Sequence, residues 1–176
     1  MSLKGKKIGV LIEKDYQDLE VWYPALRLRE EGAEVLLIGT TERSVKGKYG
    51  YPATADRLME EITAADLDGL LVPGGWAPDF LRRHAPVLRL VREIAGAGKP
   101  LAAICHAGWV LASAGVLKGK KATSFFAIRA DVENAGATWI DAAVVVDGHL
   151  ITARTPDDLP VFTRAFIDAL AERGRP

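Results

Sequence analysis

The sequence predicts a single α/β domain, in which helices sandwich a mostly parallel, doubly wound sheet and one small hairpin is added. Short apolar runs alternate with longer segments of helical periodicity, which is the pattern of consecutive βαβ units. The runs are apolar throughout, as expected of strands buried on both faces. A length of 176 residues suits one domain, 1–176, with a core of its own.

The chain begins with a βαβ unit. The run "KKIGVLIE" at 6–13 is rich in β-branched residues and predicts a buried strand. In the segment 18–32, the residues Leu19, Trp22 and Leu26 recur at helical spacing, which predicts a helix. The next apolar run completes the unit.

The remaining elements follow from apolar runs, helical spacing and turn residues. Further core strands are expected at 33–40, 66–75 and 100–105. The other expected elements are a loop or short hairpin at 41–56, a helix at 77–99 interrupted at Ala85–Pro86, a helix at 106–120 ending near Gly115, a short strand at 121–125, a helix at 127–136, a hairpin at 142–154 around Asp147–Gly148, and a last helix at 155–174.

Composition excludes several classes of protein. Lys and Arg number 23, as do Asp and Glu, so nothing calls for nucleic acid or an anionic membrane as partner. The apolar run 8–12 is too short for a signal peptide, and no stretch approaches the roughly 20 residues of a membrane helix. One cysteine excludes internal disulfides and fits a reducing compartment. We expect a soluble, cytoplasmic protein.

No cofactor or metal is expected. The histidines His84, His106 and His149 are scattered without ligand spacing on one element. The sequence also lacks a G-x-G-x-x-G phosphate loop, which makes a nucleotide cofactor improbable.

Three predicted strands end in chemically active residues. The first is followed by "IEKDYQDLE", the third ends in "PGGWAPD" and the fourth ends in "ICHAG". Because ligands bind beyond the carboxyl ends of strands in open α/β sheets, we expect these segments to meet at one site.

Cys105, the only cysteine, lies between the strand 100–105 and the helix expected from His106. Such a strand–turn–helix junction holds a nucleophile in a strained backbone conformation and points it outward. The helix N-terminus would lower the pKa of the thiol from about 8.5 to roughly 3.5–7.5. A buried inert cysteine is the alternative, and position alone leaves both open.

Nearby residues offer the rest of a catalytic set. His106 either activates the thiol or only caps the helix, and Asp79 is a carboxylate that can orient a histidine. The amides of Gly74, Gly75 and His106 either form an oxyanion hole or belong to ordinary turns. Glu20, early in the first helix, is either a solvated acid or a hydrogen-bond partner of the thiol.

Four blocks of the chain, in order, resemble the ThiJ/PfpI superfamily, and within it the PfpI branch of small intracellular cysteine peptidase-like and stress proteins. The blocks are "VLIEKDYQDLEVWYPALRLREEGAEV", "DGLLVPGGWAPDFLR", "GKPLAAICHAGWVLASAGVLKGKKATS" and "RTPDDLPVF". The resemblance extends from about Lys7 to Leu170. It implies a flavodoxin-like fold with Cys105 as the nucleophile and His106 as its adjacent histidine.

The resemblance also implies how the remaining residues act. Asp79 would be the acid of the triad, contributed by a neighbouring subunit, so that the site implies a dimer, often built up to a hexamer. Glu20 would be a buried, protonated acid that hydrogen-bonds the cysteine. Gly75 and the His106 amide would form the oxyanion hole.

The sequence departs from the family pattern at three places. Ala107–Gly108 stands where the family commonly has Gly-Pro after Cys-His. Phe125 replaces a tyrosine that is frequent in the peptidase members, and Trp76 occupies a position that is often Arg or His. We therefore expect differences in the geometry of the elbow and in substrate preference.

The resemblance implies a cysteine-dependent enzyme with a role in stress protection. The thiolate of Cys105 would attack a carbonyl of a small compound or peptide, as a peptidase-like hydrolase or as a deglycase or glyoxalase acting on methylglyoxal adducts. The alternative is a non-enzymatic redox-sensing stress protein or chaperone that works through oxidation of Cys105. A glutamine amidotransferase is rejected, because His149 has no acid two residues later.

Overall fold

Seven strands form the main sheet in the computed structural model, which describes residues 2–173. Their order is β10-β11-β7-β6-β1-β2-β5. The strands are β1 (Lys7–Leu11), β2 (Glu34–Gly39), β5 (Arg57–Leu58), β6 (Gly69–Val72), β7 (Leu101–Ile104), β10 (Val144–Asp147) and β11 (Leu150–Ala153). All neighbours are parallel except β10 and β11, which form an antiparallel hairpin at one edge. The expected sheet and hairpin are confirmed.

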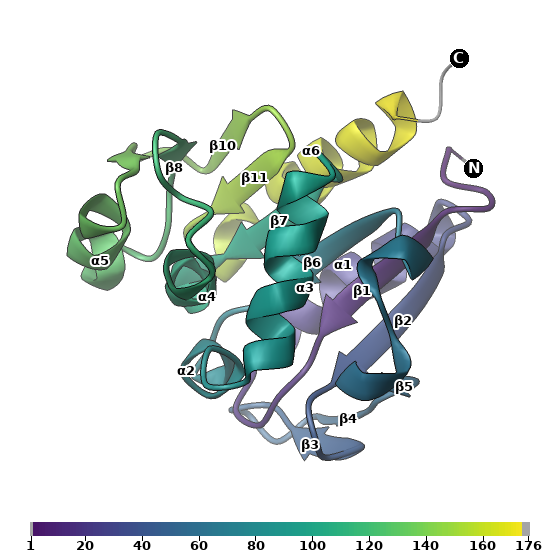
Figure 1. Ribbon diagram of the computed structural model, residues 1–176. Helices are drawn as coiled ribbons and strands as arrows, with labels where there is room; N and C mark the ends of the chain where they lie inside the picture. Colours follow the sequence, from purple (N-terminus) through teal and green to yellow (C-terminus); the bar gives the residue numbers. More distant parts are fainter. Residues whose placement is uncertain (1, 174–176) are drawn as a thin grey trace.

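Helices cover both faces of this sheet (Figure 1). On one face, α1 (Asp18–Glu30) packs against β1 and β2, and α6 (Leu159–Glu172) packs against β10 and β11. On the other face, α3 (Ala85–Gly96) and α4 (Gly108–Ala114) lie over β6 and β7. The short helices α2 (Ala77–Leu81) and α5 (Arg129–Asn134) both pack against α4.

The predicted break in the helix 77–99 separates α2 from α3, because Pro86 is accommodated in the first turn of α3. The last helix follows a 3₁₀ turn at Pro156–Asp158. Gly174, its expected end, lies outside the described residues.

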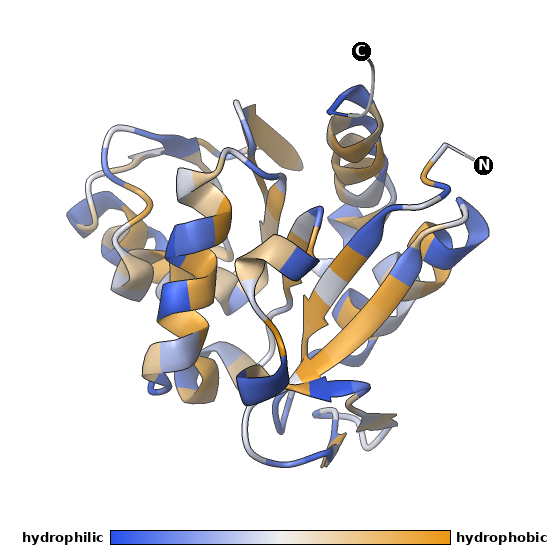
Figure 2. Cartoon of the chain, turned by 45° about the vertical axis from the view of Figure 1, so that its right-hand side comes forward, coloured by the Kyte–Doolittle hydropathy of each residue, from blue (hydrophilic) through white to orange (hydrophobic). Residues whose placement is uncertain are grey.

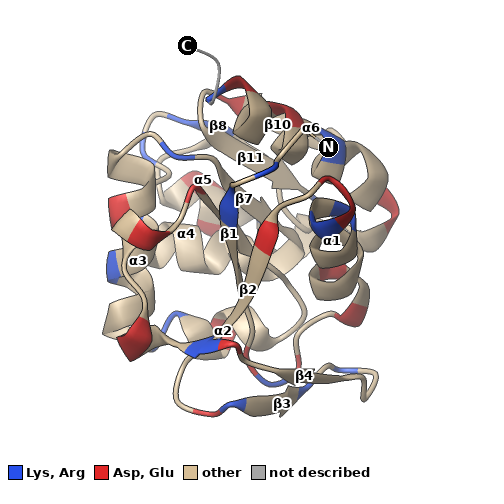
Figure 3. Cartoon of the chain, turned by 90° about the vertical axis from the view of Figure 1, so that its right-hand side faces the viewer, with Lys and Arg blue, Asp and Glu red and all other residues tan. Residues whose placement is uncertain are grey.

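The strands are apolar on both faces because helices bury both sides. Leu70, Leu71 and Val72 in β6, like Leu101 in β7, are fully buried, and each such side chain contributes about 1.5–3 kcal/mol through burial. Figure 2 shows β1 and β2 as largely hydrophobic strands, and Figure 3 shows the charged residues on outer helical surfaces and strand ends. None of the helices formed within 2–173 combines the length and the apolar character needed to cross a membrane.

Helix α1 is confirmed, but Leu19 and Leu26 do not belong to its core face. Leu19 and Leu26 are 57% and 58% exposed, whereas Val21 and Leu28 are fully buried. Trp22 is half-buried and packs against the edge of the core, so the apolar spacing that predicted the helix does not mark its buried face.

Two short strand pairs lie outside the main sheet. β3 (Ser44–Lys46) and β4 (Pro52–Thr54) form an antiparallel hairpin, which confirms the hairpin alternative for 41–56. This hairpin lies beyond the carboxyl ends of β1 and β2 (Figure 1). β8 (Lys121–Ala122) pairs in parallel with β9 (Thr138–Trp139), so the strand expected at 121–125 is only two residues long.

Candidate active site

The segments that follow β1, β6 and β7 meet at one edge of the sheet, as the order of the strand ends predicts. Tyr16 and Gly75 form an antiparallel bridge. The Gln17 N–H donates to the Gly74 carbonyl at 3.1 Å, and the Trp76 N–H donates to the Asp15 carbonyl at 2.9 Å. The loop after the first strand is therefore fixed to the Gly-Gly turn after the third.

Cys105 occupies a strained turn at the end of β7. Its φ of +63° places it in the left-handed region, which costs an L-residue roughly 1–2 kcal/mol. Asp15 is the only other non-glycine residue within 2–173 that has a positive φ. The Phe125 N–H donates to the Cys105 carbonyl at 3.1 Å and helps to hold this conformation.

The helix expected to begin at His106 begins later. Cys105–Ala107 form a 3₁₀ turn, and α4 starts at Gly108. A Cβ on Gly108 would lie 3.0 Å from atoms of Ile128 and Val132. The glycine at this position therefore allows α5 and the turn before it to approach α4.

Glu20 lies directly beside the nucleophile. Gln17 caps α1 by accepting the Glu20 N–H at 3.1 Å, and the Glu20 carboxyl is fully buried. The Gly74 N–H donates to Glu20 Oε2 at 2.7 Å, while Oε1 makes no hydrogen bond with any residue between 2 and 173. A Cβ on Gly74 would lie 2.5 Å from Glu20 Oε2 and 2.6 Å from Cys105 Cβ. Only glycine fits here.

Burial governs the protonation of this pair. It raises the pKa of Glu20 to about 8, although the Gly74 N–H and Cys105 oppose the shift. Burial, and then the charge of Glu20, raise the pKa of Cys105 to about 12, against the lowering effect of the Gly75 and His106 N–H groups. The expected lowering of the thiol pKa is therefore wrong, because desolvation outweighs the N–H groups of the turn.

The two groups titrate as a pair. Because the first proton leaves near pH 8, the pair holds two protons at neutral pH. Loss of one proton leaves a single proton shared by the carboxyl of Glu20 and the thiol of Cys105. One arrangement of this state is a thiolate beside a carboxylic acid, which is the reactive form.

His106 is placed to exchange a proton with the thiol. Its Nδ1 lies 3.2 Å from Cys105 Sγ. Burial, followed by the charge of Lys48, lowers the pKa of His106. The imidazole is therefore neutral at pH 7, which is the form that acts as a base.

Aromatic side chains surround the imidazole of His106. The ring centroids of Trp76, Trp109 and Phe125 lie 5.5, 5.0 and 4.9 Å from that of His106. Two of the departures from the family pattern, Trp76 and Phe125, thus lie against His106. They make its surroundings less polar than Arg or Tyr would.

Asp79 does not orient His106 within one chain. It lies on α2, where its carboxylate pairs with Arg83. It is absent from the lining of the pocket that holds Cys105. The in-chain role considered for Asp79 is therefore not supported.

Cys105 opens into a cavity of about 200 Å³. Its wall includes Lys48 and Tyr49 from the β3–β4 hairpin and Thr155 and Pro156 from the segment before α6. Sequence reasoning assigned no role to these four residues. The Gly-rich loop at 41–56 and the "RTPDDLPVF" block were the available signals, but neither indicates contact with Cys105. Within 2–173, no cluster of three or more His, Cys, Asp or Glu side chains suits a metal ion.

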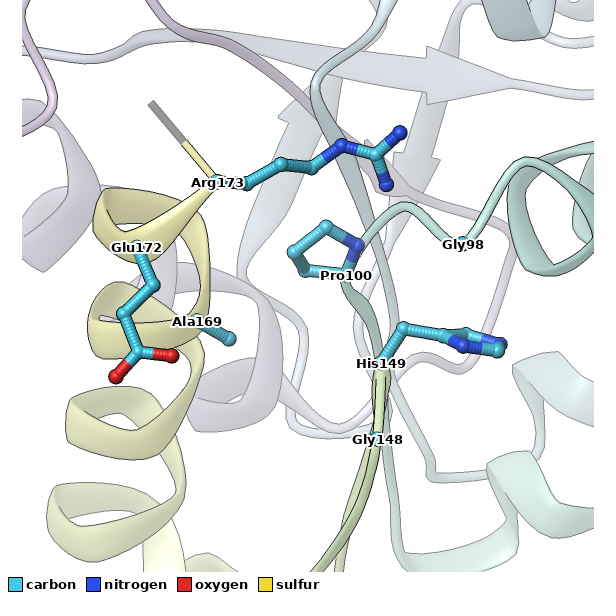
Figure 4. Close-up of a pocket in the computed structure, with 7 residues that line it drawn as sticks. All are labelled: Gly98, Pro100, Gly148, His149, Ala169, Glu172 and Arg173. Atoms are coloured by element: carbon cyan, nitrogen blue, oxygen red, sulfur yellow. The ribbon is translucent and has the colours of Figure 1, made fainter. Parts of the chain in front are cut away.

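A larger cavity, of about 480 Å³, lies at the opposite end of the strands, where β7 and β11 begin. His149 comes from the turn between β10 and β11, Pro100 precedes β7, and Arg173 follows α6 (Figure 4). This cavity lies at the amino ends of the strands and contains no nucleophile. Its position is not the one that binds ligands in doubly wound sheets.

Comparison with known proteins agrees with this geometry. Residues 6–169 match the DJ-1/PfpI family. The chain is 45% identical to "Protein/nucleic acid deglycase 2" of Escherichia coli over 163 residues, which cover 91% of this chain and 95% of that protein. It is 42% identical to "Deglycase PfpI" of Pyrococcus furiosus over 164 residues, which cover 93% and 99%.

A solved structure gives the same result. A two-domain protein from Anabaena variabilis with DJ-1/ThiJ/PfpI-like and ferritin-like domains superposes with a TM-score of 0.91 at 43% identity. The match covers 94% of this chain and 48% of that one. The resemblance to the PfpI branch is thereby confirmed, and the chain belongs to the DJ-1/PfpI family.

Proposed function

We propose that this protein is a cysteine-dependent enzyme that attacks carbonyl groups, as a deglycase or glyoxalase on methylglyoxal adducts or as a peptidase-like hydrolase, in stress protection. The observation that carries the proposal is the strained Cys105, which faces His106 and the buried Glu20 in one pocket. The deglycase names of two relatives more than 40% identical support the same reaction class.

The geometry supports a nucleophilic addition. The Cys105 thiol gives its proton to His106, and the sulfur forms a bond to the carbonyl carbon while the π electrons move to the oxygen. The N–H groups of Gly75 and His106, which reach the sulfur, can donate to that oxygen. With a peptide-like amide, the carbonyl re-forms as the C–N bond breaks, the amine leaves with the proton from His106, and water hydrolyses the thioester to a carboxylic acid and the free thiol. With a methylglyoxal adduct, the sulfur replaces the amine at the carbon that carries the hydroxyl, the amine leaves with that proton, and collapse of the S–C–OH group releases the aldehyde and the thiol.

The activity panel compares wild type with Cys105→Ser. Methylglyoxal consumption, reversal of adducts on amines and hydrolysis of peptides are measured in parallel. We expect at least one of these reactions to be lost in the variant. If every rate is the same in the variant and in wild type, the proposal is overturned.

The redox-sensing alternative uses the same thiol. Peroxide attacks the thiolate, which is also the form that attacks a carbonyl, so the pKa of Cys105 does not separate the two proposals. Mass spectrometry after graded peroxide decides the matter. Sulfinic acid at Cys105 at low peroxide, together with no Cys105-dependent turnover, would favour a sensor.

We further propose that the protein self-associates as a dimer or hexamer, because Asp79 lies outside the pocket of its own chain. A second copy could bring an acid to His106. Light scattering after size exclusion tests this, and a fully active monomer would contradict it. We place the enzyme in the cytoplasm, where its one free cysteine stays reduced.

A further inference from the structure

The wall of the Cys105 pocket carries one cation that lacks a partner. The Lys48 side chain lines this pocket. Within the described chain, no carboxylate lies within 4.0 Å of its ammonium group. Its Nζ lies 5.1 Å from the centroid of the Tyr49 ring. A charge facing a pocket without a counter-ion is available to a ligand.

The backbone of Lys48 is held firmly beside the active site. The Tyr49 and Tyr51 N–H groups each donate to the carboxylate of Asp18 at 3.0 Å. The Lys48 N–H donates to the Tyr16 carbonyl at 2.9 Å. A Cβ on Gly47 would lie 2.5 Å from Asp18 Cγ. The hairpin loop is therefore anchored to the segment that carries Glu20.

Within one chain, the remaining groups of the pocket leave Lys48 uncompensated. Its charge is close enough to act on both Glu20 and His106. Near neutral pH, Glu20 is protonated and His106 is neutral, so neither balances the ammonium group. Within one chain, the pocket therefore has one positive charge among neutral polar, apolar and aromatic side chains.

We propose that Lys48 determines substrate specificity by binding a carboxylate that lies next to the reacting carbon. The substrate class is an amine adduct of a small 2-oxo acid, which suits a cavity of about 200 Å³. The Cys105 sulfur replaces the amine at the adduct carbon, the amine leaves with a proton, and collapse of the S–C–OH group returns the thiol and the free 2-oxo acid. The assignment rests on the proposed reaction of Cys105.

Two alkylating agents of nearly equal size test Lys48 without turnover. Iodoacetate carries a carboxylate and iodoacetamide is neutral, and each forms an S–C bond to Cys105 as iodide leaves. Both reagents react with the same thiolate, so the ratio of their rates cancels changes in thiol pKa. We expect Lys48→Met to lower the iodoacetate-to-iodoacetamide ratio about tenfold, the effect of one unit charge a few ångströms away.

Control variants isolate the charge at this position. Lys48→Arg keeps the charge, and the rate ratio should stay within about twofold of wild type. Lys46→Met removes an exposed cation from the same hairpin outside the lining of the pocket, and should leave the ratio unchanged. A ratio in Lys48→Met within twofold of wild type, or an equal fall in Lys46→Met, would overturn the proposal.

A second measurement compares amine release from the glyoxylate adduct and from the methylglyoxal adduct of the same amine. We expect Lys48→Met to raise KM for the glyoxylate adduct about tenfold and KM for the methylglyoxal adduct less than twofold. If no reaction of the activity panel depends on Cys105 but the alkylation ratio still falls, the proposed function fails and anion binding by Lys48 stands. If both adducts are cleaved and Lys48→Met changes neither KM nor the alkylation ratio, the Lys48 assignment alone fails.

Discussion

Two cavities of this protein lie at opposite ends of the strands of the same sheet and differ in size and in chemical character. The cavity around His149 is more than twice as large, at about 480 Å³ against about 200 Å³. The smaller one contains the strained Cys105, the buried acid Glu20 and Lys48, a cation without an ion pair to any residue in 2–173. Position relative to the strand ends, rather than volume, separates the chemical site from a surface hollow.

The two cavities differ because the backbone turns beside them have different surroundings. At the carboxyl ends of β6 and β7, the chain turns through Gly75 and Cys105, both with positive φ, and the turns aim N–H groups at one point. At the other edge, Gly148 also has a positive φ, of +62°, but no atom lies within 4 Å of the space its Cβ would take. The same local turn is crowded at one end and open at the other.

Removing the nucleophile gives the largest expected difference between the cavities. Cys105→Ser should lower kcat/KM at least about 10³-fold, because the hydroxyl is a far weaker nucleophile at neutral pH. His149→Ala in the larger cavity should leave kcat/KM within about twofold. Steady-state kinetics with the substrate found in the activity panel measures both values of kcat/KM. A large loss of kcat/KM in His149→Ala would contradict the assignment of the active site to the smaller cavity.

The glycines of the two cavities should differ in their tolerance of alanine. Gly74→Ala would force a methyl group against Glu20 Oε2 and Cys105 Cβ, which should destabilise the fold by about 2–4 kcal/mol and abolish activity. Gly148→Ala meets no neighbouring atom and should cost only about 1 kcal/mol of backbone strain. Urea unfolding of both variants measures this, and equal losses would contradict the contrast.

Glu20 should make stability fall as pH rises. Its pKa is about 8 in the folded state against an ordinary value of 4.5, so between these values the folded state holds the proton that the unfolded state has lost. Each pKa unit corresponds to about 1.4 kcal/mol, so the free energy of unfolding should decline by a few kcal/mol over this pH range. Glu20→Gln should remove this pH dependence.

Urea unfolding of wild type and Glu20→Gln at pH 5 and pH 8 tests the effect of Glu20. The free energy of unfolding of the variant, relative to that of wild type, should be larger at pH 8 than at pH 5. If the free energies of unfolding of the two proteins change in parallel with pH, the pKa of Glu20 is not raised.

His149 should show the smallest effect, and with the opposite sign. Burial, followed by the charge of Lys120, lowers its pKa, so the unfolded state binds more protons just below pH 6.5 and stability falls as pH falls. His149→Gln should remove this small acid-side loss. Thermal melting at pH 5 and pH 7 compares the variant with wild type, and a larger acid-side loss in the variant would contradict it.

The sequence was enough to predict the sheet, its hairpins and the residues around the nucleophile. Apolar runs identify strands because burial on both faces leaves little room for polar residues. Cys105 and Gly74 could be placed near one another because the carboxyl ends of parallel strands gather at one end of a sheet, whereas position alone favoured a solvated acid for Glu20 and only the family resemblance placed it beside the thiol. The conformation of Cys105 followed from its place between a strand and a helix.

What failed were properties that depend on distant contacts. Lys48 and Thr155 reach the pocket from segments far from Cys105 in the chain, and no local pattern brings them there. The pKa of the thiol depends on burial by the whole fold, so the helix terminus alone predicted the wrong direction. Leu19 and Leu26 show that apolar spacing predicts a helix but not which face is buried.

The anchoring of the β3–β4 loop by Asp18 has a consequence for engineering. The chemical steps depend on core segments around Cys105, whereas the charge facing the substrate comes from a surface loop fixed at both of its ends. The loop 47–51 can therefore be replaced without changing the segments around Cys105. Grafting another loop of the same length, with Gly47 and Asp18 retained, should change the substrate preference while the segments around Cys105 keep their structure.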